Sequence, residues 1–364
     1  HLRRERSRES PAGPISRLPT EGTGREAGDM QRSSDPGPAD TVTFPGCPTP
    51  VAPLGVGTWA WGDSRTWGMG SYDTALDETT IGDAWRSSLG AGVGLFDTAE
   101  VYGSGESERI LGRLLSADPS GRDRLVIATK FWPAPWRWNV VSALRQSLEA
   151  SLGRLQIPTV DLYQIHGPIS LRSASAMAEA LATVVDAGLV RAVGVSNYSV
   201  REMTRIHSEL RRRGVPLASN QIELSLLRTR PLSSGLIDAC RDLGVVPIAY
   251  SPIGQGRLTG KYSASNPPPG RRNFSAHPME AVDRVVAVAR EIGDAHDGRT
   301  PAQVALRWII DKGAVPIPGA KNERQAVDNA GALGWSLDAA EVAALDRVAL
   351  AGTDSIANRV WQHG

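Results

Sequence analysis

Four polar side chains stand at or just after the ends of three short apolar segments of the sequence. Asp97 ends one segment in LFDTAEVYG, and Tyr102 follows it on the next stretch. Lys130 ends the next segment in VIATKF, and His166 ends a third in DLYQIH. Neighbouring parallel strands lie about 4.8 Å apart, so the four side chains can converge on one spot if these segments are such strands.

This set of groups suits the reduction of a carbonyl, in which a hydride reaches carbon and a proton reaches oxygen. A tyrosine hydroxyl with its ordinary pKa of about 10 is a poor acid near neutral pH. A lysine ammonium beside it lowers that pKa, and a carboxylate keeps the lysine charged. A neutral imidazole can donate a hydrogen bond to the substrate oxygen. We therefore expect Tyr102 to donate the proton, Lys130 and Asp97 to support it, and His166 to orient the substrate.

Each of these residues also has a simpler interpretation. Asp97 could cap a helix that begins near residue 106, and Tyr102 could be an ordinary loop aromatic. His166 alone fits packing as well as function, whereas lysine is rarely buried without a partner. A second enzymatic interpretation is a barrel aldolase or hydrolase that uses Lys130 as a Schiff-base nucleophile. The four residues together favour reduction.

The elements that must position these residues are visible as short apolar or β-branched runs after residue 50. Their near-continuous apolar character is typical of parallel strands that are buried on both faces. The eight segments that we expect to be strands are 54–59, 94–99, 126–130, 161–166, 192–197, 219–225, 246–251 and 314–319. In barrels, catalytic groups sit at the carboxyl ends of such strands.

Amphipathic segments separate these runs. In 139–155 and 281–292, apolar residues recur every three or four positions, which is the period of one helix face. Gly188, Gly214, Gly244 and Gly313 stand where a helix commonly ends before the next strand. Eight strand–helix repeats predict an α/β fold, the (β/α)8 TIM barrel. The rival, an open doubly wound sheet, would normally carry a glycine-rich dinucleotide motif after its first strand, and 54–59 is followed by none.

Composition narrows the class of protein. The chain has 364 residues, of which 41% are hydrophobic and 22% charged, as is ordinary for a globular protein. The net charge of +1 favours neither nucleic acid nor a membrane surface, and no apolar run approaches the roughly 20 residues of a spanning helix. Cys47 and Cys240 are far apart in the sequence, so we expect free thiols and no metal site.

The first forty residues differ from the rest. Segment 1–40 is rich in Arg, Ser, Pro and Gly and nearly lacks large apolar residues, so we expect a disordered extension before a single barrel domain at 41–364. Arg and Ser are typical of an organelle transit peptide, whereas the seven acidic residues of the segment are not. A remnant of a targeting segment and a plain disordered tail both remain open.

The motifs together resemble the aldo-keto reductase superfamily over essentially all of residues 50–350. FDTAEVYG, ATKF and LYQIH match its catalytic Asp, Tyr, Lys and His in order. GVSNYS at 194–199 matches its nicotinamide-amide site, and NQIELSLL at 220–227 carries the matching glutamine. AYSPIGQGRLTGKY at 249–262 matches the segment whose tyrosine stacks on nicotinamide and whose serine opens a pyrophosphate loop. PIPGAKNERQAVDNAGALGW at 316–335 matches the adenosine-phosphate segment.

The resemblance implies NADPH as cofactor. The residues that it places against the cofactor are Thr58, Trp59, Ser196, Asn197, Gln221, Tyr250, Ser251, Pro252, Ile253, Gly254, Lys261, Gly319, Lys321, Gln325, Asp328 and Asn329. The chain departs from many members at Gly319–Ala320, where they carry Lys–Ser, and at Gln325, where they carry Arg. Lys321 can still reach the 2′-phosphate, with help from Arg324 or from Lys261 and Arg272, so we expect NADPH rather than NADH.

Within the superfamily, GTWAWG, GLVRAVGVSNY, RGVPLASNQ and PIPGAKN resemble the plastid and cyanobacterial oxidoreductases that include pyridoxal reductases. This likeness implies a small carbonyl substrate, with pyridoxal or another aromatic aldehyde as the candidate, and a chloroplast location with the cytoplasm as the alternative. Five tryptophans after the first and third strands favour an aromatic wall for such a substrate or, alternatively, simple rim packing: Trp59, Trp61, Trp132, Trp136 and Trp138.

A non-enzymatic alternative also follows from the resemblance. Some aldo-keto reductases are NADPH-sensing regulatory subunits of potassium channels. The sequence carries no channel-docking signal, and its complete set of four catalytic residue types favours an enzyme.

Overall fold

The structure is a computed structural model that describes residues 41–62, 76–269, 276–353 and 355–364. All of them belong to one compact unit, Gly37–Gly364. The expected disordered extension at 1–40 lies outside the described residues and stays a prediction.

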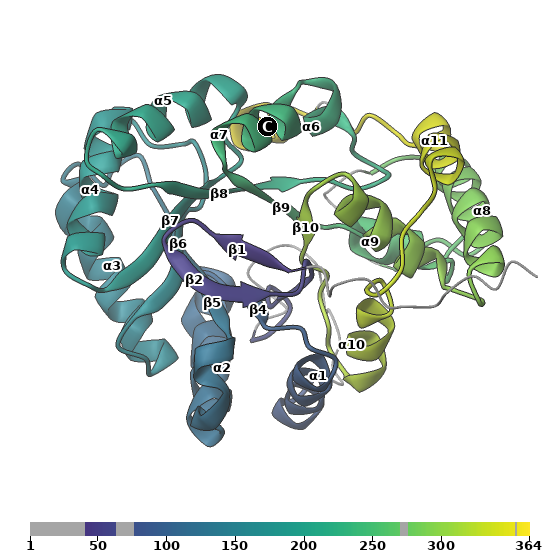
Figure 1. The fold of residues 1–364 in the computed structure, drawn as a ribbon, viewed down its shortest axis with the longest axis horizontal. Coiled ribbons are helices and arrows are strands. Elements are labelled where there is room, and N and C mark those ends of the chain that lie inside the picture. Colours follow the sequence, from purple (N-terminus) through teal and green to yellow (C-terminus); the bar gives the residue numbers. More distant parts are fainter. Residues whose placement is uncertain (1–40, 63–75, 270–275, 354) are drawn as a thin grey trace, which may run out of the picture. The chain divides into compact units, whose positions relative to one another are not determined.

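Eight parallel strands form the centre of this unit (Figure 1). They are β3 (Gly55–Gly57), β4 (Leu95–Asp97), β5 (Val126–Phe131), β6 (Val160–Ile165), β7 (Val190–Ser196), β8 (Leu217–Glu223), β9 (Val246–Tyr250) and β10 (Val315–Pro316), and they neighbour one another in chain order. Gly57 donates its N–H to the Pro318 carbonyl at 3.0 Å, and a parallel bridge joins Gly57 to Gly319. This bridge links the first strand to the last, so the predicted (β/α)8 barrel is confirmed.

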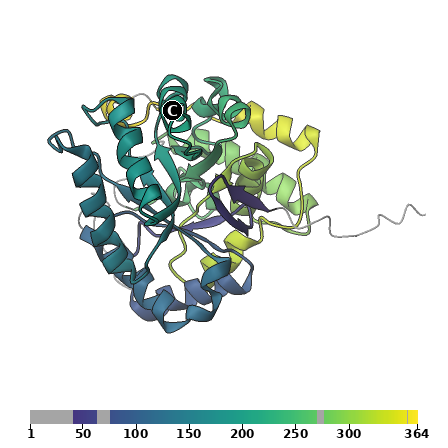
Figure 2. The ribbon, with the colours of Figure 1, turned by 60° about the vertical axis from the view of Figure 1, so that its left-hand side comes forward.

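Helices follow the strands on the outside, as Figures 1 and 2 show. They are α1 (Glu78–Gly90), α2 (Glu106–Ala117), α3 (Val140–Leu155), α4 (Ala174–Asp186), α5 (Val200–Arg211), α6 (Arg230–Ser233), α7 (Leu236–Leu243), α8 (Met279–Ala295), α9 (Pro301–Asp311), α10 (Glu323–Ala330), α11 (Ala339–Val348) and α12 (Ile356–Trp361). Capping boxes begin α1, α5, α9 and α11. The four predicted end glycines all take a left-handed φ, between 68° and 83°. Helices α1 and α10 pack together and close the ring.

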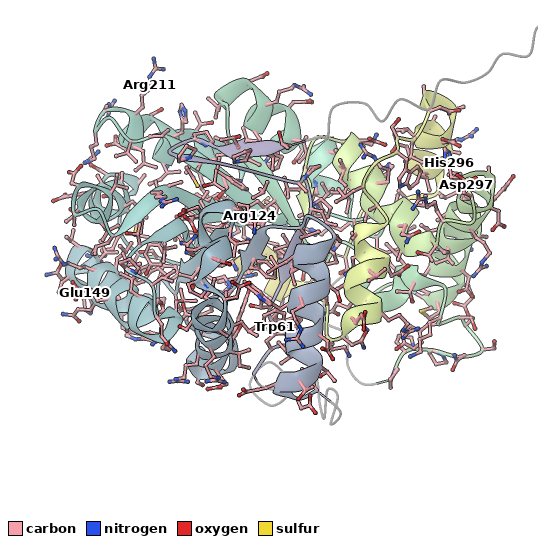
Figure 3. All side chains as sticks on the ribbon, turned by 60° about the horizontal axis from the view of Figure 1, so that its bottom comes forward. Trp61, Arg124, Glu149, Arg211, His296 and Asp297 are labelled. Atoms are coloured by element: carbon pink, nitrogen blue, oxygen red, sulfur yellow. The ribbon has the colours of Figure 1, made fainter. Side chains whose placement is uncertain are left out.

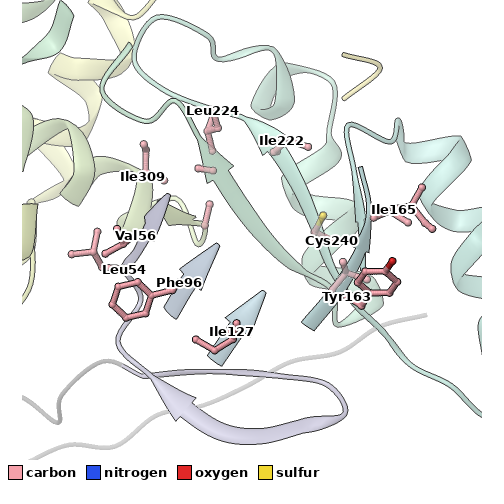
Figure 4. Packing of buried hydrophobic residues seen from close by; sticks show 14 of the residues in the cluster. Leu54, Val56, Phe96, Ile127, Tyr163, Ile165, Ile222, Leu224, Cys240 and Ile309 are labelled. Atoms are coloured by element: carbon pink, nitrogen blue, oxygen red, sulfur yellow. The ribbon is translucent and has the colours of Figure 1, made fainter. Parts of the chain in front are cut away.

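The strands divide the core into two layers because alternate side chains point to opposite faces. Phe96, Ile127 and Tyr163 point outward and pack against the helices (Figure 4). Leu95, Val126 and other inward residues form a separate cluster inside the barrel. The polar outer surface is visible in Figure 3, where Glu149 and Arg211 point away from their helices.

An N-terminal hairpin that the sequence analysis did not predict closes one end of the barrel. It consists of β1 (Val42–Phe44) and the antiparallel β2 (Cys47–Val51). Phe44, Cys47 and Val51 are buried in the same cluster as the inward-facing strand residues. The turn residue Gly46 has φ 91° and lies against the Arg191 carbonyl at the start of β7. The hairpin therefore covers the amino ends of the strands.

Two further searches concern only the described residues. No helix among them is both long and apolar enough to span a membrane. No group of three or more His, Cys, Asp and Glu side chains in this part of the chain is arranged to hold a metal ion.

Candidate active site

A buried lysine–aspartate pair lies inside the barrel, toward the carboxyl ends of β4 and β5. The Lys130 side chain is fully buried, and its ammonium donates to a carboxylate oxygen of Asp97. The same Nζ donates to the Thr98 carbonyl oxygen at 2.9 Å and to the Tyr102 hydroxyl oxygen at 3.3 Å. All three ammonium protons have acceptors, so the lysine is fixed against Tyr102.

The second oxygen of Asp97 is held by two glutamines. Its Oδ1 accepts from Gln221 Nε2 at 2.8 Å and from Gln164 Nε2 at 3.2 Å. Gln164 was not among the predicted site residues; its signal is a polar residue at an inward position of the apolar strand β6. Gln221 was expected at the nicotinamide, and the structure places its amide nitrogen on the Asp97 carboxylate.

Burial and charge act in opposite directions on this cluster. Burial raises the pKa of the Tyr102 hydroxyl, and the attraction of Lys130 offsets only part of that rise. The expectation that Lys130 lowers the pKa of Tyr102 below its ordinary value is therefore wrong in net direction, because the loss of solvation is larger. Burial lowers the pKa of Lys130, but the attraction of Asp97 and Tyr102 outweighs it and leaves that pKa raised. Lys130 is therefore charged and Tyr102 protonated near neutral pH.

His166 lies beside Tyr102 and is neutral. Burial, and then the charge of Lys130, hold the pKa of the imidazole well below its ordinary value. The Tyr102 and His166 rings meet edge-on with centroids 5.7 Å apart. The buried Nδ1 of His166 has no hydrogen-bond partner among the described residues. A neutral ring in contact with Tyr102 fits the expected role of orienting a polar substrate atom.

Four of the five tryptophans named in the sequence analysis lie in three different environments. Trp132 packs edge-on against His166 at 5.7 Å and stacks on Trp361 at 5.1 Å. Trp361, which sequence reasoning missed, also contacts His166 at 5.5 Å. Trp61, labelled in Figure 3, is fully buried and donates to the Ala320 carbonyl, so the expectation that it lines a substrate wall is wrong. Trp136 and Trp138 are 72% and 67% exposed and belong to the rim.

The predicted nicotinamide contacts gather at the ends of β7, β8 and β9. Ser196 Oγ donates to the Gln221 carbonyl at 2.9 Å, and the Asn197 amide donates to Ser196 Oγ at 3.2 Å. The Tyr250 hydroxyl donates to Asn197 Oδ1 at 2.9 Å. Asn197 has a left-handed φ of 62°, a strained conformation that is common at ligand sites.

The loop after β9 also has a left-handed backbone, which is strained at Ser251 but not at the glycine. Ser251 has φ 50° and Gly254 has φ 56°, with Pro252 and Ile253 between them. Lys261 follows on the exposed side, with its ammonium 5.6 Å from the centre of the Tyr262 ring.

The predicted contacts on β3 lie elsewhere in the site. Thr58 is buried at the end of this strand and donates its hydroxyl to the Asp97 carbonyl at 2.9 Å. Trp59 follows it.

The predicted phosphate segment follows β10. Gly319 accepts from Asn329 at 3.2 Å, and the Lys321 N–H donates to the Gln325 side chain at 3.0 Å. Asp328 accepts from the hydroxyl of Thr300, the N-cap residue of α9, at 3.2 Å. This segment leads into the amino end of α10, where the helix dipole favours an anion. Arg272, named as a possible helper, lies outside the described residues.

The comparison with known families decides what this arrangement is. A model described as "Aldo/keto reductase family" matches residues 53–350. The chain belongs to the aldo-keto reductase family. It is therefore an oxidoreductase, and the predicted enzyme class is confirmed.

Individual aldo-keto reductases and related proteins match most of the chain. A protein named chloroplastic pyridoxal reductase, from Arabidopsis thaliana, is 39% identical over 86% of this chain and 88% of its own length. A glycerol dehydrogenase structure from Gluconobacter oxydans has a TM-score of 0.72 and 29% identity, covering 85% of this chain and 94% of that one. An aldo-keto reductase from Klebsiella pneumoniae, solved in complex with NADPH, has a TM-score of 0.67 and 26% identity, covering 85% and 95%.

Proposed function

We propose that this enzyme uses NADPH to reduce an aldehyde or ketone to an alcohol, with Tyr102 as the general acid. The observation that carries the proposal is the contact of the Tyr102 hydroxyl with the buried Lys130–Asp97 pair. Lys130 donates to the tyrosine oxygen, which leaves the hydroxyl proton directed at another acceptor. A substrate carbonyl oxygen at this point would accept that proton as its negative charge develops.

The protein side chains divide the remaining work. After proton transfer, Lys130 stabilises the tyrosinate through the same 3.3 Å contact. Asp97, held by Gln164 and Gln221, keeps Lys130 in place. Neutral His166 orients the carbonyl oxygen without competing as an acid. NADPH, when bound, supplies the hydride.

The residues present fit this cofactor. Asn197, Ser196 and Tyr250 form a hydrogen-bonded group next to Tyr102 and Lys130, with a strained backbone at Asn197, and this group suits an amide and an aromatic ring. Lys321 and Arg324 flank the start of α10, where cations and a helix dipole suit a phosphate. The NADPH complex of the Klebsiella relative supports the same assignment.

Reversing the charge of Lys321 tests the phosphate site. Lys321→Glu should raise the apparent KM for NADPH by about 10- to 100-fold, the value of one charge-assisted hydrogen bond, and that for NADH far less. Lys312→Glu is the control, because Lys312 lies outside the predicted phosphate segment 316–335 and pairs with Asp346 of α11. Equal changes for both cofactors in Lys321→Glu would show that the 2′-phosphate binds elsewhere.

We propose an aromatic or heteroaromatic aldehyde, with pyridoxal as the leading candidate, as the substrate. Trp132, Trp361 and His166 present three ring systems within 5.1–5.7 Å of one another beside Tyr102. Aromatic rings favour a planar aromatic partner over a small sugar. The name of the Arabidopsis relative supports pyridoxal.

The same name supports a plastid location for this protein. Import of the chain into isolated chloroplasts tests the location, and exclusion of the chain from them would contradict it.

Substrate preference should depend on Trp361. Trp361→Ala should lower kcat/KM for pyridoxal or nitrobenzaldehyde by about 3- to 10-fold, with a smaller effect on glyceraldehyde. The exposed Trp138→Ala is the control and should change neither. NADPH oxidation against this aldehyde panel is the measurement. Rapid turnover of glyceraldehyde with none of the aromatic aldehydes would overturn the substrate proposal.

A further inference from the structure

The second and third residues of helix α2 are polar and completely buried. Ser107 and Glu108 have no exposed surface, although they lie in the first turn of a helix on the outside of the barrel. An acidic residue in the first turn complements the helix dipole at a solvated position and does not need burial. Burying a carboxylate is costly unless it is paired, so the contacts of Glu108 must account for it.

Glu108 is hydrogen-bonded to β5, the strand that carries Lys130. Its Oε1 accepts from the Thr129 hydroxyl at 2.6 Å, and its Oε2 accepts from Arg154 Nε at 2.6 Å. Thr129 immediately precedes Lys130, and side chains alternate along a strand. Thr129 therefore points outward to the helices while Lys130 points into the barrel. The carboxylate holds β5 at the residue next to the catalytic lysine.

The same ion pair holds the turn that carries Tyr102. This turn, Tyr102–Gly105, leads directly into α2. Gly105 has φ 88° and lies against the Arg154 side chain, since a Cβ there would be 2.7 Å from Arg154 Cδ. Arg154 comes from α3 and is held by Glu108, so turn, helix and strand meet at one ion pair.

Ser107 connects the amino end of α2 to the residues that follow β3 and β4. Its hydroxyl lies 2.7 Å from the Thr58 hydroxyl and 2.9 Å from the Thr98 hydroxyl. The Thr98 carbonyl accepts from Lys130, and the Thr58 hydroxyl donates to the carbonyl of Asp97. Ser107 thus connects the tyrosine turn to the backbone that surrounds the lysine–aspartate pair.

We propose that Glu108, with Ser107, is a positioning residue that fixes the Tyr102 hydroxyl against Lys130 during proton transfer. The proposal rests on the proposed function of Tyr102 as general acid. Neither residue contacts the reacting atoms; they act through Thr129, Arg154 and the turn. A displacement of about 1 Å of a catalytic group can cost roughly 10²-fold in rate. Loss of the contacts of Glu108 and Ser107 should therefore lower kcat more than it changes KM.

The test compares Glu108→Ala and Glu108→Gln with a control. Glu108→Ala should lower kcat by about 10- to 100-fold with little change in KM, and should raise the solvent deuterium isotope effect on kcat as proton transfer becomes slower. Glu108→Gln keeps an acceptor for Thr129 and should recover part of the loss. If Glu108→Ala does not fold, Thr129→Val is the substitute: it replaces the hydroxyl that Glu108 accepts from by a methyl group, and it should also lower kcat.

Asp161→Asn is the matched control. Asp161 is an equally buried carboxylate that accepts from the Ile127 N–H of the same strand and pairs with Arg122 at 2.7 Å, near the other end of the barrel. It should lose stability without changing kcat or the isotope effect. Glu108 variants that match this control, on an aldehyde that the wild type reduces, would overturn the positioning role and leave the proposed function standing. A wild type that reduces no aldehyde would overturn both.

Discussion

Replacing Tyr102 with phenylalanine should lower the rate of aldehyde reduction by about 10²- to 10⁴-fold, the usual loss when a general acid is removed. The substitution keeps the ring beside His166 and removes only the hydroxyl that Lys130 contacts. The proposed cofactor contacts at Asn197 and Tyr250 are unchanged, so the dissociation constant for NADPH should stay near the wild-type value. Steady-state turnover and a fluorescence titration with NADPH measure the two quantities.

A control for Tyr102→Phe is available in the same barrel. Tyr163→Phe removes the hydroxyl of another buried tyrosine, whose side chain points outward from β6 to the Leu144 carbonyl at 3.5 Å. It should leave the rate unchanged. If Tyr102→Phe binds NADPH and still reduces substrate at near the wild-type rate, another residue donates the proton, and His166 is the next candidate.

The pH dependence follows from the direction of the Tyr102 pKa. The donor is active while protonated, and burial raises its pKa above the ordinary value of about 10. Reduction should therefore persist through moderately alkaline pH and fall only as the pH rises through that raised pKa. A wild-type rate that already falls between about pH 7 and 9 would contradict this assignment.

Replacing Lys130 with methionine should be at least as damaging. Methionine is slightly shorter and keeps an unbranched apolar side chain, but it removes the charge that stabilises tyrosinate and leaves the Asp97 carboxylate buried without its cation. Breaking a buried pair in this way typically costs about 3–5 kcal/mol of stability, so turnover must be measured under conditions where urea unfolding shows the variant to be folded.

A double variant separates charge balance from catalysis. Lys130→Met with Asp97→Asn removes both charges and should recover much of the lost stability, while turnover stays low because Tyr102 has no adjacent cation. Recovery of turnover in the double variant would show that Lys130 serves only to neutralise Asp97.

A borohydride experiment tests the alternative in which Lys130 is a Schiff-base nucleophile. Formation of an adduct on Lys130 after treatment with substrate and borohydride would favour that chemistry over reduction.

The barrel and the cluster around Lys130 could be predicted because buried parallel strands appear in the sequence as apolar runs. A polar residue at the end of such a run has few structural explanations, which is why Asp97, Lys130 and His166 stood out. Gln164 was missed because it lies within a strand rather than at its end. Its role depends on which face it occupies and on what the opposite strand presents, which a single segment does not show.

Other features depend on contacts that are distant in the sequence. The hairpin at 42–51 contains three prolines in ten residues and reads as a loop; its burial comes from the barrel end that it covers. Trp361 reaches His166 from near the last residues of the chain, and no local pattern places it there. The predicted direction of the shift in the Tyr102 pKa was wrong. The shift depends on how completely the hydroxyl is buried, whereas the sequence shows only that a lysine is near.

Product analysis with NADPH that carries deuterium at the transferable position tests the central claim most directly. The account predicts that the enzyme converts an aromatic aldehyde to an alcohol with one deuterium on the carbinol carbon, and that one NADPH is oxidised for each alcohol formed. Tight binding of NADPH with no deuterium in any alcohol, across a panel that includes pyridoxal, would contradict it. That result would favour an NADPH-sensing regulatory protein over a reductase.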